Sequence, residues 1–330
     1  MEIFRIKEEG GYAMQEKKWI YLIHLSTNMW GDPGSNFIYK PYYDTFHTDE
    51  DIWRKTIDFL PAQGFNSLLI DVGDAIQYES HPEIAIAGAW SKEKMKKELD
   101  YIRSIGLTPL PKLNFSTCHD AWMGEYSRMV STKQYYQFCD DVIDEVCELF
   151  DYPQLFHLGM DEEGLACQKE YSICHIRFGD LWWHDVYKLF NACDRNGVRP
   201  WVWADPCWKH PDVYLKKMPK SVMQSNWWYD PMPRAEDGTF EDHRPGCYQL
   251  LEKAGYDQIP TCSSTWSYQF NTDDTLREVC SCISDERLKG VIAAPWQLTT
   301  QEYYYTLLDE ANRFGLAKRK YFPDAPESLY

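Results

Sequence analysis

Apolar runs of strand length alternate with amphipathic stretches of helix length along most of the chain. This alternation is typical of parallel βα units, in which a helix follows each strand and packs on the sheet. The pattern predicts eight strands and eight helices in strict alternation. The strands are expected at residues 19–25, 66–72, 107–114, 155–160, 199–204, 222–226, 259–264 and 290–295. The expected helices include residues 49–63, 91–105, 131–150, 175–195 and 302–314.

Eight βα units favour a closed barrel over an open doubly wound sheet. We therefore predict an α/β protein built as a single (β/α)8 TIM barrel over residues 1–330, with an N-terminal extension at 1–18 and a C-terminal tail at 317–330. The length suits this fold, which typically needs about 250 residues plus loops. No helix is opened by a GxGxxG or P-loop motif, which argues against nucleotide binding. Pro109 and Pro111 are awkward in the third strand, because proline cannot donate to a ladder.

Composition narrows the classes of partner. The formal net charge of −17 argues against nucleic acid, which needs a basic face, and against an anionic membrane surface. No run of about 18 apolar residues occurs, so no transmembrane helix is expected. The 11 cysteines include no CxxC pair, and we interpret most of them as buried residues in a reducing compartment. We expect a cytoplasmic protein without a metal or other cofactor, and a homo-oligomer is one alternative for its assembly.

The residues at the C-terminal ends of the predicted strands indicate where the chemistry lies, since barrel enzymes work at that face. Carboxylates, amides and tryptophans predominate there, without a Ser-His-Asp set, and the chain has no HExxH motif. Its 14 Trp and 23 Tyr offer flat apolar faces with polar edges, which match a sugar ring. Paired carboxylic acids beside aromatic platforms suit glycosidic-bond cleavage. The candidates are Asn28, Asp71, His119, Asp161, Glu162, Asp205, Trp227, Trp266, Tyr268, Trp296 and Gln297.

The segment FHLGMDEE, at the end of the fourth strand, carries the main chemical signal. Side chains alternate across a strand, so His157 and Asp161 share one parity, while the apolar Leu158 and Met160 share the other. We expect His157 and Asp161 to face the barrel interior and Glu162 to turn inward just past the strand. Two adjacent carboxylates in a Trp-lined pocket cannot both ionise easily, so one pKa should rise and suit a general acid. The alternative is an acidic cluster that caps the following helix.

The string His157-x-Gly159-x-Asp161-Glu162 resembles the His-x-Gly-Gly-Asp-Glu motif of glycoside hydrolase family 20, the β-N-acetylhexosaminidases. Met160 stands in place of the second glycine. Weaker likenesses follow in the right order along the barrel. They place Asp71 at the family's second-strand aspartate, His119 at its histidine after strand three, Asp205 at its strand-five glutamate, and Trp266, Tyr268 and Trp296 at its last aromatic residues.

The resemblance implies exo-acting, retaining cleavage assisted by the substrate. In that mechanism the 2-acetamido oxygen of the sugar attacks the anomeric carbon, Asp161 orients the acetamido group, and Glu162 protonates the leaving oxygen and then activates water. Trp227, Trp266 and Trp296 would wall the sugar, and Tyr268 would hydrogen-bond the acetamido oxygen. His119, His157, Asp71, Asn28, Asp205 and Gln297 complete the predicted substrate contacts.

Two departures from the family pattern bear on the substrate. The family usually has a sugar-gripping Arg at the end of strand one, where this chain has Ser26-Thr27-Asn28, and Gln297 or a later residue replaces an acid after the last tryptophan. The expected partner is therefore a small oligosaccharide or glycoside whose exact sugar is open. Two alternatives stay open as well: a glycosidase of the same barrel type acting on a neutral hexoside, and an inactive carbohydrate-binding barrel.

Overall fold

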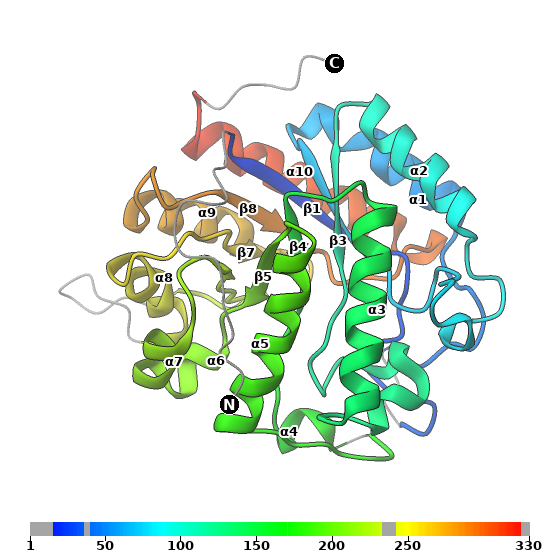
Figure 1. Ribbon diagram of the computed structural model, residues 1–330. Coiled ribbons are helices and arrows are strands. Elements are labelled where there is room, and N and C mark those ends of the chain that lie inside the picture. The colour runs from blue at the N-terminus through cyan, green and yellow to red at the C-terminus, as the bar shows by residue number, and fades with distance from the viewer. Residues whose placement is uncertain (1–15, 36–39, 170, 233–241, 325–330) are drawn as a thin grey trace.

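A single sheet of eight parallel strands forms the centre of the molecule (Figure 1). The structure is a computed structural model and describes residues 16–35, 40–169, 171–232 and 242–324. Most of the predicted N-terminal extension, residues 1–15, and the last part of the predicted tail, residues 325–330, lie outside the described residues. The strands are β1 (Lys18–His24), β2 (Ser67–Asp71), β3 (Thr108–Lys112), β4 (Leu155–His157), β5 (Arg199–Trp203), β6 (Met223–Ser225), β7 (Thr261–Cys262) and β8 (Gly290–Ala293).

The strand order is β6-β5-β4-β3-β2-β1-β8-β7, so the two edge strands are β6 and β7. Parallel bridges between Gln224 and Gln258 and between Trp227 and Thr261 join these two edges. The bridges close the sheet, and the predicted (β/α)8 barrel is confirmed.

Helices surround the barrel, and α3 and α5 lie side by side on its outside (Figure 1). Short helices between β4 and β5 and between β5 and β6 interrupt the predicted strict alternation. No helix in the described ranges is long and apolar enough to cross a membrane. The α-helices are α1 (Glu50–Phe59), α2 (Lys92–Ser104), α3 (Lys133–Leu149), α4 (Leu165–Gln168), α5 (Asp180–Arg195), α6 (Pro206–Lys209), α7 (Pro211–Lys217), α8 (His243–Lys253), α9 (Asn271–Cys282) and α10 (Tyr304–Tyr321). The 3-10 helices are η1 (Pro61–Gln63), η2 (Pro82–Ile84), η3 (Ala121–Arg128) and η4 (Gln301–Tyr303).

A side-chain cap and a closely packed glycine explain the bounds of two helices, α2 and α10. The Ser91 side chain accepts the Lys94 N–H at the start of α2, as the sequence suggests. The α10 helix continues seven residues past its predicted end at 314 and includes residues 317–321 of the predicted tail. A Cβ on Gly315 would lie 2.9 Å from the Gln63 carbonyl oxygen. This glycine therefore permits close packing and does not end the helix.

The two prolines of β3 fit the sheet because of where their missing N–H groups fall. Thr108 donates its N–H to Asn66 on the β2 side, and Leu113 donates to His157 on the β4 side. Alternate residues of a parallel strand bond to opposite neighbours, so Pro109 and Pro111 have their nitrogens on the β4 side. There a single register pair joins the two strands, and few ladder bonds are lost.

The barrel interior has an apolar layer and, above it, a polar one. Ile20, Leu22, Leu69, Leu110, Leu155, Met223, Ile259, Ile292 and Ala294 form the apolar layer, and the rings of Trp201 and Trp203 extend from it beside His157. The next inward-facing position on each of β1 to β4 is polar or charged. These positions are His24, Asp71, Lys112 and His157, which lie next to one another in register. Lys112 Nζ lies 2.7 Å from Asp71 Oδ2, and His24 Nδ1 lies 3.2 Å from the same oxygen. This polar layer lies at the C-terminal ends of β1 to β4.

Candidate active site

The backbone leaves β4 in a way that sets up the candidate acids. Gly159 and Met160 have φ angles of 71° and 76°, so the strand ends at His157 and is shorter than predicted. A Cβ on Gly159 would lie 1.9 Å from Asn114 Oδ1, so no other residue fits here without moving Asn114. Leu158 and Met160 pack in the outer core, while His157 lies against the interior Trp201 ring. The predicted parity is therefore confirmed.

Asp161 is held in the cavity by two partners from the loop after β3. Asn114 donates its side-chain N–H to Asp161 Oδ1 at 2.8 Å, and His119 Nε2 lies 3.4 Å from Oδ2. The same His119 nitrogen lies 3.2 Å from Glu162 Oε2. The imidazole ring thus stands between the two carboxylates, and the loop after β3 positions both acids.

Glu162 is turned inward by its own backbone. Its φ is 58°, a left-handed conformation, and its N–H donates to Asp205 Oδ2 at 2.9 Å. The Glu162 side chain is 40% exposed, whereas that of Asp161 is 12% exposed. One acid is therefore anchored, and its neighbour is open to a ligand.

The charges at the site differ from the prediction that mutual repulsion raises a pKa in the pair. Burial alone would raise the pKa of Asp161, but the charge and hydrogen bond of His119 outweigh it and lower the pKa to about 2. Burial would lower the pKa of His119, but Asp161 and Glu162 raise it well above its usual value. The prediction is therefore wrong for Asp161, because a histidine distant in sequence supplies a positive charge. Next to the pair, burial and the nearby Asp161 charge raise the pKa of Asp205 well above its usual value.

The cavity over this pair has a volume of about 90 Å³ and is rich in aromatic rings. The structure brings six predicted site residues together at it: His119, Asp161, Glu162, Trp227, Trp266 and Trp296. It adds residues that were not predicted as site residues: Met29, Trp30, Lys40, Asn114, Trp203 and Tyr229. Trp30 and Tyr229 stand at the ends of their strands in the sequence, so strand-end position was a signal for them.

The other predicted substrate contacts do not line this cavity. His157 and Asp71 belong to the polar layer below it, and Asp205 is buried against the Glu162 backbone. Asn28 is buried and hydrogen-bonds Tyr43 in the loop after β1 and Asp74 in the loop after β2. Tyr268 packs on Phe270, and Gln297 is only partly buried. Neither Tyr268 nor Gln297 reaches the cavity wall.

Three further tryptophans after the strand ends donate their indole N–H groups to partners inside the protein. Trp122 is 1% exposed and donates its indole N–H to the Asn114 carbonyl. Trp208 donates to Asn226, and Trp228 is 8% exposed and donates to the Pro231 carbonyl. Trp122 and Trp208 thereby support residues next to the cavity.

The raised pKa of His119 predicts a pH-dependent contribution to stability. A histidine whose folded pKa exceeds its unfolded value of about 6.5 stabilises the fold fully below pH ~6.5, and this contribution is lost as pH rises through the folded value. The lowered pKa of Asp161 keeps its own contribution intact above pH ~4. We therefore expect the free energy of unfolding lost in His119→Gln to be largest between pH ~4 and 6.5 and to shrink at alkaline pH. Urea denaturation at pH 5, 7 and 9 measures this loss.

The control for this prediction is His243→Gln, at an exposed position. A loss in His119→Gln that stays constant from pH 5 to 9 would contradict the raised pKa of His119.

The same three residues are the candidates for a metal ion in the described part of the chain. The ligand atoms of His119, Asp161 and Glu162 all lie within 4.8 Å of one another. Hydrogen bonding of His119 with the two carboxylates accounts for this arrangement.

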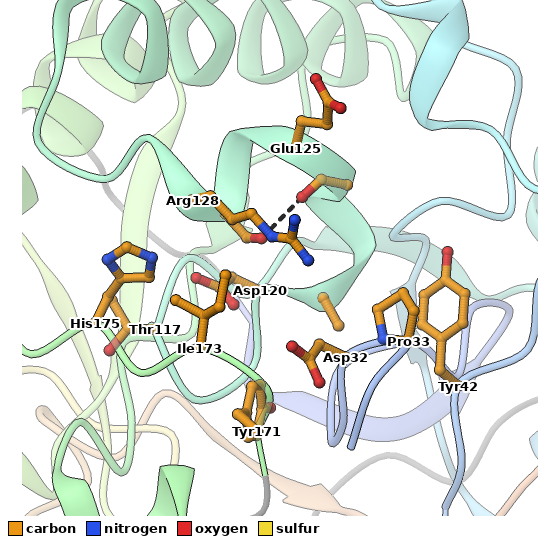
Figure 2. Close-up of a pocket in the computed structure, with 13 residues that line it drawn as sticks. Asp32, Pro33, Tyr42, Thr117, Asp120, Glu125, Arg128, Tyr171, Ile173 and His175 are labelled. Carbon is orange, nitrogen blue, oxygen red and sulfur yellow. Dashed lines mark hydrogen bonds between the residues drawn. The ribbon is translucent and has the colours of Figure 1, made fainter.

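A second cavity has a larger volume, about 210 Å³, and Figure 2 shows the side chains that line it. Its walls come from the loop after β1, from η3 and from the loop after β4, and Arg128, Asp32 and Tyr171 lie around it in Figure 2. It contains no tryptophan and neither acid of the Asp161–Glu162 pair, so the chemistry favours the smaller cavity as the candidate active site.

The chain is similar in fold to β-N-acetylhexosaminidases. The enzyme from Bacteroides fragilis NCTC 9343 aligns over 94% of this chain and 71% of its own, with a TM-score of 0.60 and 15% identity. The family 20 enzyme from Streptomyces coelicolor A3(2) aligns over 91% of this chain and 64% of its own, at 0.61 and 14%. A mutant Streptomyces plicatus β-hexosaminidase in complex with N-acetylglucosamine aligns over 96% and 70%, at 0.61 and 13%. No protein-family model and no curated protein sequence matches the chain. The comparison confirms the family 20 resemblance at the level of the fold.

Proposed function

We propose that this protein is a glycoside hydrolase that removes a terminal N-acetylhexosamine-type sugar with retention of configuration. The observation that carries the proposal is the placement of Asp161 and Glu162. One acid is fixed and the other is accessible, both contact His119, and both line a tryptophan-walled cavity at the catalytic face of the barrel. The fold likeness to β-N-acetylhexosaminidases supports the same assignment.

Asp161 is suited to orient the acetamido group. Its pKa of about 2 keeps it ionised at neutral pH, and Asn114 and His119 fix both of its oxygens. An ionised carboxylate can accept the acetamido N–H and stabilise the positive charge that develops as the acetamido oxygen bonds to the anomeric carbon. The glycosidic bond breaks as this new bond forms, and a cyclic intermediate results.

Glu162 is suited to move the proton. The departing oxygen takes a proton from the Glu162 carboxyl, and the His119 ring 3.2 Å away stabilises the carboxylate that remains. Glu162 then takes a proton from the water that opens the cyclic intermediate. The bond from the anomeric carbon to the acetamido oxygen breaks, and the sugar leaves with its configuration retained.

The aromatic walls position the ring. Trp227, Trp266 and Trp296 line the cavity and supply apolar faces for the C–H surface of a sugar. Tyr229 also lines the cavity, whereas Tyr268 does not, so we assign to Tyr229 the hydrogen bond to the acetamido oxygen that the sequence assigned to Tyr268.

Turnover of matched aryl glycosides tests the proposal. We expect 4-nitrophenyl N-acetyl-β-glucosaminide to be hydrolysed with a kcat/KM at least about tenfold above that of 4-nitrophenyl β-glucoside, because only the first carries the internal nucleophile. Hydrolysis of the plain glucoside alone would contradict the acetamido mechanism and favour the neutral-hexoside alternative. Binding without turnover of either would favour a carbohydrate-binding barrel.

A further inference from the structure

Lys40 is a buried lysine that the proposed reaction does not use. It lies between β1 and α1, is 5% exposed, and lines the cavity that contains Asp161 and Glu162. Its Nζ lies 3.6 Å from the centre of the Trp30 ring and 4.7 Å from that of Trp266. No residue described in the structure accepts a hydrogen bond from this nitrogen.

The acids near the cavity already have other partners. Asp161 contacts His119 and Asn114, and Glu162 contacts His119. Asp71, whose charge acts on Lys40, is paired with Lys112 at 2.7 Å. Burial lowers the pKa of Lys40 to about 7, against the raising effect of Asp71. The ammonium is therefore desolvated without a direct anionic partner in the described structure.

The two indole rings alone do not offset this desolvation. Cation–π contacts contribute about 0.5–2 kcal/mol, whereas a buried unpaired ion costs several. The cavity also contains Trp203, whose buried indole N–H has no acceptor among the described residues. Unused donors, one of them positively charged, favour a ligand that brings acceptor oxygens, and an oxyanion satisfies the ammonium most strongly.

The position of Lys40 shows which part of a sugar it would meet. The acids come from β4, while the rings around Lys40 follow β1 and β7. These two strands flank β8 in the sheet order, and β8 lies opposite β4 around the closed barrel. A sugar whose anomeric carbon faces Glu162 therefore turns its non-reducing side toward Lys40.

We propose that this cavity binds a terminal sugar carrying an oxyanion, either a carboxylate or a sulfate ester, on its non-reducing side, and that Lys40 determines this specificity. The inference rests on the proposed function for the orientation of the sugar. Binding itself does not require turnover.

Calorimetric titration at fixed ionic strength tests the inference with three sugars that all carry the acetamido group: N-acetylglucosamine, N-acetylglucosamine 6-sulfate and N-acetylglucosaminuronic acid. We expect at least one anionic sugar to bind about 10-fold or more tighter than the neutral one, since a hydrogen bond to a charged group contributes about 1.5–3 kcal/mol. Comparison of the two anionic sugars distinguishes the sulfate from the carboxylate. Lys40→Met should abolish the preference, and Lys40→Arg should keep most of it.

Lys209→Met is the matched control, because Lys209 is an exposed lysine on a helix after β5 and does not line this cavity. It should leave the preference unchanged. Circular dichroism and thermal denaturation establish that Lys40→Met is folded, and Lys40→Arg tests the charge independently. Equal binding of neutral and anionic sugars by the unmodified protein would overturn the inference. An equal loss of all three sugars in Lys40→Met would also overturn it, because Lys40 would then bind a neutral hydroxyl.

The outcomes separate this inference from the proposed function. Turnover of the aryl N-acetylglucosaminide without any preference for an anionic sugar overturns the inference alone. A preference for the anionic sugar, without turnover of the 4-nitrophenyl β-glycoside of that same sugar, supports Lys40 and overturns the proposed catalysis. Absence of binding by all three sugars overturns both.

Discussion

Glu162→Gln is expected to lower kcat/KM on 4-nitrophenyl N-acetyl-β-glucosaminide by about 10²–10⁴-fold, because glutamine cannot donate the proton that the leaving oxygen needs. The substitution keeps the size of the side chain, and the backbone N–H bond to Asp205 is unaffected. Asp161 retains its contacts with Asn114 and His119. The loss should therefore appear in the chemistry and not in folding.

The leaving group makes this prediction specific. A 2,4-dinitrophenyl glycoside needs little protonation as it departs, so the loss in kcat/KM caused by Glu162→Gln should be much smaller on that substrate. Glu125→Gln is the control, because Glu125 is an exposed acid on η3 that lines the second cavity and not the first. Equal losses on both glycosides would assign Glu162 a structural role and remove it as the general acid.

Much of the candidate site follows from residues close together in sequence. Strand parity in FHLGMDEE places Leu158 and Met160 in the outer core and Asp161 toward the cavity, as the structure has them. Strand-end position similarly identifies Trp227 and Trp296. Such predictions succeed because side chains along a strand alternate between its two faces, so the position of a residue near a strand end determines which face it is on.

The residues that sequence reasoning missed depend on long-range geometry. Lys40 lies far from the end of β1 in a connection without periodicity, so no local pattern gives its direction. The pKa of Asp161 could not be predicted from its neighbour alone, because His119 supplies the deciding charge from 42 positions earlier in the chain. Tyr229 and Tyr268 each follow a strand, and only the packing of the loops decides which one reaches the cavity.

Arg177 is the buried residue whose removal should most destabilise the fold. Its Nη2 lies 2.6 Å from Glu163 Oε1, and its Nη1 lies 3.0 Å from Asp185 Oδ2. It also donates to the Phe115 carbonyl at 2.6 Å, and the side chains of all three charged residues are at most 7% exposed. Glu163 is thus bound in an internal network and is separated in role from Glu162. Arg177→Met would leave two buried carboxylates without their cation, and we expect the free energy of unfolding to fall by about 3–5 kcal/mol.

Urea denaturation at pH 7 measures this loss, and Arg195→Met provides the control. Arg195 lies at the end of α5, the helix that carries Asp185, and its 3.1 Å pair with Asp140 is half exposed. That pair should contribute at most about 1 kcal/mol. Neutralising the stranded acids in Arg177→Met, through Glu163→Gln together with Asp185→Asn, should restore part of the stability, since the cost comes from unpaired buried charge. A loss below about 1 kcal/mol in Arg177→Met, or no recovery in the triple variant, would mean that the network does not hold the loop after β4 against the barrel. The placement of Glu162 would then depend on its contacts with Asp205, His119 and Cys118.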